Sequence, residues 1–145
     1  MNRNQVDFEV TGRLGNTVAL IDVKNVPRLT LSSAAELRKD LLEDDTTNSL
    51  PVYFLIISQD KSFLWEPEQA GATDAEPAAA FSMSKVLREY LTDHELDRHL
   101  RGAELEIVVL QWLSDITRGR GPIPKELVKF AESLRGAEVH GGVRQ

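Results

Sequence analysis

The sequence contains no cysteine and no long apolar run. Without cysteine, the chain can form neither a disulfide nor a thiolate metal site, and cysteine-based catalysis is excluded. The longest apolar run, VYFLII at 52–57, is far shorter than the roughly 20 residues that span a bilayer, and the N-terminal residues lack the apolar core of a signal peptide. We therefore expect a cytoplasmic protein without membrane contact.

Positive charge is also scarce. The chain has 17 Lys and Arg residues against 23 Asp and Glu residues, a net charge of −6, which argues against a protein that coats nucleic acid non-specifically. The excess acid lies in residues 1–76, with 7 basic and 13 acidic residues, whereas residues 77–145 hold 10 of each. Acidic clusters at 43–45 and 66–77 are interpreted as solvated loops.

The length and the hydrophobic content of the chain predict one domain. With 145 residues and 41% hydrophobic content, the chain can bury a single core. The apolar patterns predict an α/β (α+β) domain over residues 1–136, with a mixed central sheet flanked by helices and additional C-terminal helices, and then a flexible tail at 137–145. The expected strands are 5–11, 17–24, 51–58 and 63–65.

Helices are expected between and after these strands. The segment 32–45 has Ser33 and Glu36 in capping-box spacing, and its apolar residues follow one helical stripe. The segment 66–81, with its prolines and glycine, is predicted to be a long exposed loop. Further helices are predicted from 82, from 92 with a capping box of Thr92 and Glu95, at 105–116, where LEIVVL also fits a strand, and at 124–135.

The stretch TVALIDVKN at 17–25 places an acid and an amine at the end of a buried strand. Side chains alternate along a strand with a period of two, so Asp22 and Lys24 share one face. A hairpin turn centred on the Leu14–Gly15 pair sets Asp7, in the preceding strand, opposite Asp22. Directly opposed side chains have Cβ atoms about 4.5–5.5 Å apart, and two carboxylates that close repel each other unless a proton or a cation lies between them.

This arrangement fits metal-dependent phosphodiester hydrolysis. Mg²⁺, or Mn²⁺ in its place, binds oxygen ligands and is commonly held by one or two carboxylates together with water and a substrate phosphate. Lys24 is placed to orient the attacking water or to stabilise the charge that grows on the phosphate. Glu9 shares a face with Asp7 and is a further candidate ligand, and Arg38 is a further candidate phosphate contact, although both also fit solvated surface positions.

These residues resemble the PD-(D/E)xK nuclease superfamily, whose fold is that of restriction endonucleases. The matching elements are the acid in VDFEV, then IDVK, then an amphipathic helix and the strand in PVYFLIISQDKSFLW, and EIVVLQWLSDIT is similar to uncharacterised bacterial members. The likeness covers residues 5–65 and, more loosely, 104–117. It implies an endonuclease acting on nucleic acid, with DNA as the expected partner, in which Asp7 and Asp22 are catalytic metal ligands and Lys24 is the catalytic lysine.

The sequence departs from the family at its start. The family places a helix and a strand ahead of the first acid, whereas six residues precede Asp7 here, and Val6 stands where the family has proline. The helix at 124–135 is a candidate to fill that gap. Otherwise the edge of the first hairpin is left uncovered, which favours a homodimer.

A second interpretation needs no catalysis. Asp7, Asp22 and Lys24 also fit a cross-strand salt bridge at a strand end. The chain is then a catalytically inactive nuclease-like scaffold that acts as a protein-interaction or dimerisation module, which the acidic first half favours. The basic segment RGRGPIPK at 118–125 either contacts a phosphate backbone or caps a helix C-terminus.

Overall fold

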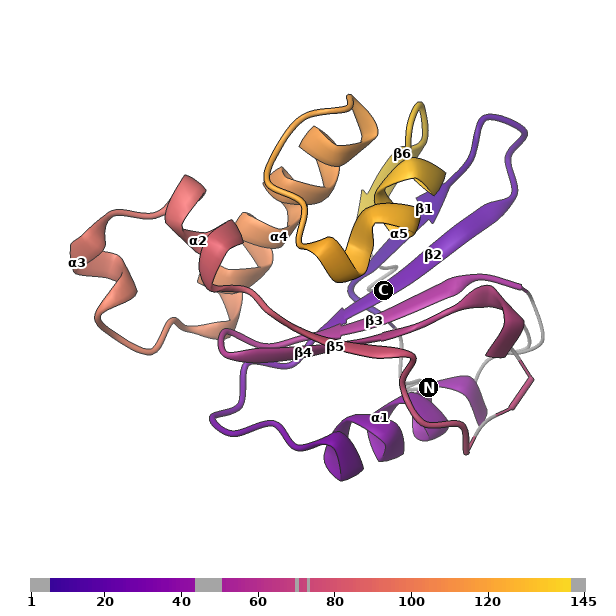
Figure 1. The fold of residues 1–145 in the computed structure, drawn as a ribbon, viewed down its shortest axis with the longest axis horizontal. Helices are drawn as coiled ribbons and strands as arrows, with labels where there is room; N and C mark the ends of the chain where they lie inside the picture. The colour runs from indigo at the N-terminus through magenta and orange to yellow at the C-terminus, as the bar shows by residue number, and fades with distance from the viewer. Residues whose placement is uncertain (1–5, 44–50, 70, 73, 142–145) are drawn as a thin grey trace.

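The computed structural model describes residues 6–43, 51–69, 71, 72 and 74–141 as one mixed sheet with helices on both faces (Figure 1). The strands follow the order β5-β4-β3-β2-β1-β6 across the sheet. Their bounds are β1 Phe8–Thr11, β2 Thr17–Val23, β3 Tyr53–Ile57, β4 Lys61–Trp65, β5 Ala79–Ser82 and β6 Glu138–Gly141. The helices are α1 Leu31–Glu43, α2 Ser84–Tyr90, α3 Asp93–Leu96, α4 Gly102–Thr117 and α5 Val128–Ser133, with short 3₁₀ turns at Pro67–Gln69 and Lys125–Leu127. The predicted mixed sheet flanked by helices is therefore confirmed.

Two apolar layers separate the sheet from its helices. Successive strand residues point to opposite faces, so neighbouring residues of β3 divide between the layers: Phe54 packs beneath α1 and Leu55 packs beneath α4 and α5. Figure 1 shows α1 on one side of the sheet and α4 and α5 on the other. Because both faces are covered, all five residues of β3 are buried, as its unbroken apolar sequence predicts.

The first hairpin has the predicted register over most of its length. The pairs are Phe8–Ile21, Glu9–Leu20 and Val10–Ala19, and continuing this register sets Asp7 opposite Asp22. A bulge after Val10 then shifts the pairing, so that Thr17 pairs with Thr11 and not with Gly12. The turn is completed by Gly15, whose φ of 83° lies in the left-handed region that glycine adopts most readily.

The parallel pairing of β2 with β3 positions the end of β2 that carries Asp22. β2 and β3 pair in parallel, with Asp22 beside Ile56, so their C-terminal ends meet at the same edge of the sheet. Parallel neighbours require a crossover, which α1 supplies. The helix begins earlier than predicted, because the Thr30 Oγ1 accepts the Ser33 N–H at 3.1 Å and takes the capping role assigned to Ser33.

The predicted helices after residue 82 are confirmed in outline. Thr92 and Glu95 form the expected capping box at the start of α3. The segment LEIVVL, which fitted both a strand and a helix, is helical and belongs to α4. In the described part of the chain, no helix is both long enough and apolar enough to cross a membrane. The predicted loop at 66–81 is wrong at its end, because residues 79–81 belong to β5. The acids at 44 and 45 lie outside the described residues.

The C-terminal segment was predicted to be a flexible tail from 137, and this is wrong for residues 138–141. They form β6, which pairs antiparallel with β1 and sets Val139 opposite Val10. The domain therefore extends to residue 141 at least, and residues 142–145 lie outside the described part of the chain. Since β6 covers the outer edge of β1, the uncovered hairpin edge that favoured a homodimer is also absent from the described structure.

Replacement of Gly136 by alanine tests the connection into β6. Gly136 has a φ of 77°, and a Cβ there would lie 2.5 Å from the Arg13 Nε. The arginine can move, but the left-handed backbone costs a non-glycine residue about 1–2 kcal/mol, so we expect Gly136→Ala to lower the free energy of unfolding by that amount in urea titrations. Gly102→Ala is the control, because Gly102 opens α4 with no atom within 4 Å of the added Cβ. Equal stability of the two variants would contradict the expectation.

Candidate functional site

Asp22 is buried beneath α1 at the C-terminal end of β2. It follows Leu20 on the α1 face by the two-residue period of the strand, and only 2% of its surface is exposed. Its Oδ2 has no hydrogen-bond partner among the described residues. A buried carboxylate oxygen without a donor is costly to folding, so this atom marks a place where the chain keeps a charge site at the expense of stability.

Asp7 faces Asp22 from the residue before β1, as the sequence predicts. Its carboxyl group is also buried, and its Oδ2 accepts the backbone N–H of Val23 at 2.7 Å. That bond fixes the side chain across the end of β2. The hairpin therefore brings two buried carboxyl groups together.

Burial and mutual repulsion change the acidity of this pair. Removal from water, followed by the negative charge of Asp7, raises the pKa of Asp22 from 3.8 to about 7. The Lys24 ammonium opposes this shift, with its Nζ 3.7 Å from the Asp22 Oδ2. Near neutral pH the pair is thus balanced between holding a proton and holding two negative charges, and a cation would favour the second state.

Lys24 lies on the solvent side of this pair. Its backbone N–H donates to the Ile57 carbonyl at 2.8 Å, which continues the parallel pairing one residue beyond β2. Its side chain is 43% exposed. The ammonium is therefore near the buried Asp22 and remains accessible from outside.

Glu9 and Arg38, the two further candidates from the sequence, are not part of this group. Glu9 accepts the Thr17 hydroxyl at 2.6 Å. Among the described residues, no three His, Cys, Asp or Glu side chains gather as a metal-binding set, so Glu9 does not join the two aspartates. The lysine and the two aspartates are thus the members that the structure brings together.

The predicted exposed position of Arg38 is wrong. Arg38 belongs to α1, and its side chain is buried between this helix and the sheet. The guanidinium lies over the Trp65 ring, 5.3 Å from the ring centroid. It donates to the carbonyls of Ala72 at 2.8 Å and Gln69 at 3.0 Å. Arg38 therefore holds the β4–β5 connection against α1, and both of its terminal nitrogens are engaged in this contact.

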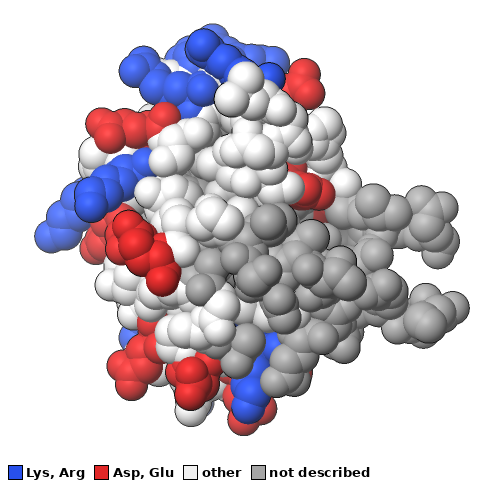
Figure 2. All heavy atoms as spheres, turned by 90° about the vertical axis from the view of Figure 1, so that its right-hand side faces the viewer, with Lys and Arg blue, Asp and Glu red and all other residues white. Residues whose placement is uncertain are grey.

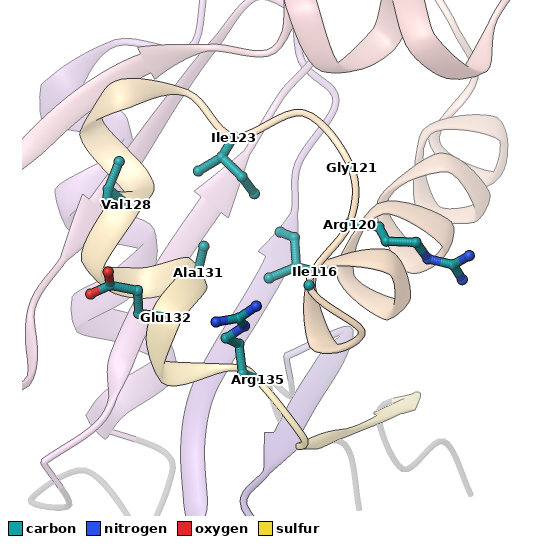
Figure 3. Close-up of a pocket in the computed structure, with 9 residues that line it drawn as sticks. Ile116, Arg120, Gly121, Ile123, Val128, Ala131, Glu132 and Arg135 are labelled. Carbon is teal, nitrogen blue, oxygen red and sulfur yellow. The ribbon is translucent and has the colours of Figure 1, made fainter.

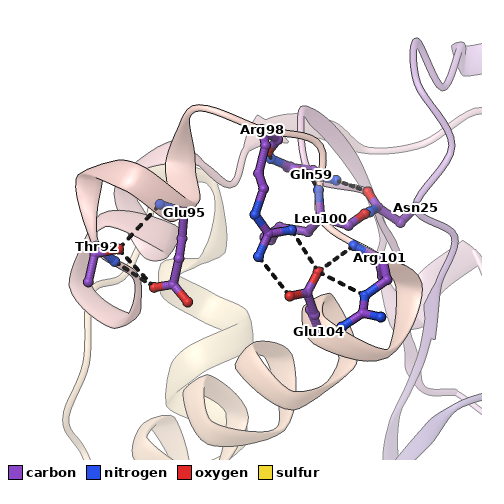
Figure 4. A network of polar contacts seen from close by, with 8 residues as sticks. All are labelled: Asn25, Gln59, Thr92, Glu95, Arg98, Leu100, Arg101 and Glu104. Carbon is purple, nitrogen blue, oxygen red and sulfur yellow. Dashed lines mark hydrogen bonds and ion pairs between the residues drawn. The ribbon is translucent and has the colours of Figure 1, made fainter.

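Two amide side chains that the sequence analysis missed tie a distant segment to this edge (Figure 4). Asn25 lies two residues beyond β2 and its Nδ2 donates to the Leu100 carbonyl, while Gln59 lies two residues beyond β3 and its Oε1 accepts the Leu100 N–H at 2.6 Å. The Gln59 N–H also donates to the Asn25 Oδ1 at 3.1 Å. The signal available in the sequence was positional, since both amides stand just after strands that end at the same edge.

The tied segment carries positive charge. Residues 98–101 read RHLR, and the loop that follows β2 adds Lys24 and Arg28 without an acid between residues 24 and 30. Arg98 forms a double hydrogen bond to Glu104, at 3.0 and 2.8 Å, which neutralises part of this charge. Arg101 also pairs with Glu104, at 3.6 Å, and Asp60 and Asp97 stand next to Gln59 and Arg98 in the sequence, so this edge carries charges of both signs.

Comparison with protein-family models, with curated proteins and with solved structures found no match. The function of the site has to be argued from its own geometry.

The raised pKa of Asp22 predicts an unusual dependence of stability on pH. Because the folded pKa of about 7 lies above the ordinary 3.8, the folded state binds this proton more tightly than the unfolded chain. The stabilisation from this group is complete below pH 4 and is lost as the pH rises through 7, by an amount on the order of a few kcal/mol. Urea titrations at several pH values, in chelator, measure it.

Asp22→Asn removes this group while keeping its shape. The neutral amide avoids the cost of a buried charge, so we expect the variant to be more stable than the wild type at pH 8 by about 1–3 kcal/mol and to lose the pH dependence of Asp22 between 4 and 7. The exposed Asp60 provides the control, since Asp60→Asn should keep the wild-type dependence. An Asp22→Asn variant that loses stability as steeply as the wild type would contradict the assignment.

Proposed function

We propose that this protein is a metal-dependent nuclease-like protein that binds and hydrolyses the phosphodiester backbone of nucleic acid, with DNA as the expected substrate. One observation carries the proposal: the Asp22 Oδ2 is buried without a hydrogen-bond donor among the described residues, next to a second buried carboxyl group. Sites built for chemistry often retain such unfavourable groups, because the ligand supplies the missing interaction.

The donor atoms fit a hard divalent cation. Both side chains offer carboxylate oxygens, and Mg²⁺ or Mn²⁺ is held in many phosphate-processing sites by one or two such groups together with water and the substrate phosphate. Asp7 and Asp22 are the residues that would hold it. A cation bound there would lower the pKa of a bound water and stabilise charge on the phosphate.

The protein groups around the pair have separate tasks in this proposal. The Val23 N–H holds Asp7 in place, so that the carboxyl groups are oriented before a ligand arrives. Lys24 presents a mobile ammonium at the open side, where it attracts a phosphate oxygen and stabilises the charge that grows on it. Asn25 and Gln59 hold the segment 98–101 beside the same edge, so the backbone there is fixed as well.

The order of the elements supports the same function. An acid before one strand, an acid-x-Lys motif at the end of the next, a helical crossover and a parallel buried strand follow one another here, as in the nuclease superfamily that the sequence resembles. At the place where that family has a leading strand and helix, this chain has β6 along β1 and α5 on the same layer. This part of the proposal is an argument from fold, which by itself does not establish activity.

A second candidate follows from the acidity of the pair. With the pKa of Asp22 near 7, one proton and the Lys24 ammonium can satisfy both carboxylates without a cation. The chain would then be an inactive nuclease-like scaffold whose partner is another protein, or a second copy of itself. A titration with Mg²⁺ and Mn²⁺ separates the two candidates.

Calorimetric titration with Mg²⁺ and Mn²⁺ tests the metal site first. We expect the wild type to bind at sub-millimolar concentrations at pH 8 and Asp22→Asn to lose at least about tenfold in affinity, because one of two charged ligands is removed. Glu9→Gln is a matched control, since the Glu9 carboxylate is held by Thr17 and should not contribute. If neither ion binds, or if both variants weaken binding equally, the inactive scaffold is the better account.

Cleavage assays then separate binding from chemistry. Lys24→Ala keeps both aspartates, so it should bind the cation as the wild type does and lose cleavage of single- and double-stranded DNA by about 100-fold or more, as expected for removal of a group that stabilises the transition state. The exposed Lys39, on the helix that follows the motif, gives the control Lys39→Ala. A Lys24→Ala variant that cuts at the wild-type rate would remove the lysine from the mechanism.

A further inference from the structure

A cavity of about 300 Å³ lies between the end of α4 and α5, away from the two aspartates (Figure 3). Ile116, Ile123, Val128 and Ala131 form its apolar walls. Ile123 and Val128 are 37% and 49% exposed. Apolar side chains that stay open to solvent around a concave site are typical of a small-molecule pocket, which binds by removing this surface from water.

The walls are fixed by the backbone that follows α4. Gly119 and Gly121 have φ values of 76° and 93°, which allow the chain to turn sharply after the helix. The loop is then held on both sides, because the Trp112 Nε1 donates to the Pro122 carbonyl and the Gly136 N–H donates to the Thr117 carbonyl, each at 2.8 Å. The cavity is therefore formed before any ligand binds, which lowers the entropic cost of binding.

One cation at the cavity is free to meet an anion. Arg135 and Glu132 both line the cavity; in Figure 3 the Arg135 guanidinium points into the space between Ala131 and Ile116, and the Glu132 carboxylate points away from it. No carboxylate of the described residues lies within ion-pair distance of it. The absence of a Cβ at Gly119 makes room for this group, since an added Cβ would lie 3.0 Å from the Arg135 Nη2.

The second arginine of the cavity has a different position. Arg120 points away from the cavity in Figure 3, and its Nη2 lies 3.9 Å from the Asp115 Oδ1. The same aspartate accepts the Tyr90 hydroxyl at 2.6 Å. Arg120 is therefore committed to a neighbouring ion pair, and Arg135 is the arginine that can serve a ligand.

We propose that this cavity binds a small amphiphilic anion, with an apolar body against Ile116, Ile123 and Val128 and a single carboxylate paired with Arg135. The planar guanidinium matches a carboxylate in a two-point hydrogen bond, and the apolar walls select against small inorganic anions. Figure 2 shows Lys and Arg side chains gathered at the end of the molecule that carries the hairpin tip and the α4–α5 connection in Figure 1. This charge favours the approach of an anion.

Octanoate is the probe, and octanol is its neutral counterpart. Amide shifts in ¹⁵N-labelled protein should locate octanoate at residues 116–135, and the titration gives its affinity. We expect Arg135→Gln to weaken octanoate binding by about tenfold or more, and to leave octanol binding unchanged, because a charged hydrogen bond is lost while the apolar walls remain. Arg135 is exposed, so the variant should fold as the wild type does.

Arg120→Gln is the matched control, because it removes the same charge from the same loop region without changing the group that faces the cavity. It should bind octanoate within about twofold of the wild type. Equal weakening in both variants would mean general attraction to a basic surface and would overturn the proposal. The absence of octanoate binding at millimolar concentration, or shifts located elsewhere, would overturn it as well. None of these outcomes depends on whether the protein is a nuclease.

Discussion

The parallel pairing of β2 with β3 is the constraint on which the rest of the structure depends. It sends the chain through α1 as a crossover and brings the C-terminal ends of both strands to one edge of the sheet. Asp22, Lys24 and Asn25 follow one another at the end of β2, and Gln59 stands at the end of β3. Asp22 and the amides that hold residues 98–101 thus share an edge because two strands share a direction.

The layer beneath α1 combines two buried charges of opposite sign that are treated differently. The terminal nitrogens of Arg38 donate to two carbonyls and its guanidinium lies over aromatic rings, which offsets part of the loss of water, although its Nε has no hydrogen-bond partner among the described residues. The Asp22 Oδ2 likewise has no hydrogen-bond donor among them and has only the Lys24 ammonium, 3.7 Å away, as a charged neighbour; the raised pKa of Asp22 expresses the cost of its burial. Both charges are therefore only partly compensated, and that of Asp22 is compensated less.

The two halves of the molecule carry separate candidate sites. The acidic pair lies on the α1 side near the C-terminal end of β2, whereas the octanoate-sized cavity lies between α4 and α5 on the other layer. Arg135 and Lys24 both present positive charge to solvent, but only Lys24 forms an ion pair among the described residues, although Glu132 lines the same cavity as Arg135. The local environment, and not the residue type, distinguishes them: Lys24 lies beside a buried carboxyl group, and Arg135 lies at an apolar cavity.

The sequence by itself determined the local patterns: the hairpin that opposes Asp7 and Asp22, the shared face of Asp22 and Lys24, the capped α3 and the buried β3. These follow from the two-residue period of strands and from capping chemistry, which act over a few residues. Only the tertiary structure decided that Arg38 is buried and that residues 138–141 complete the sheet, because both depend on partners distant in the chain. A polar side chain becomes buried, or a polar segment becomes a strand, when a remote neighbour supplies its hydrogen bonds, and no local pattern contains that information.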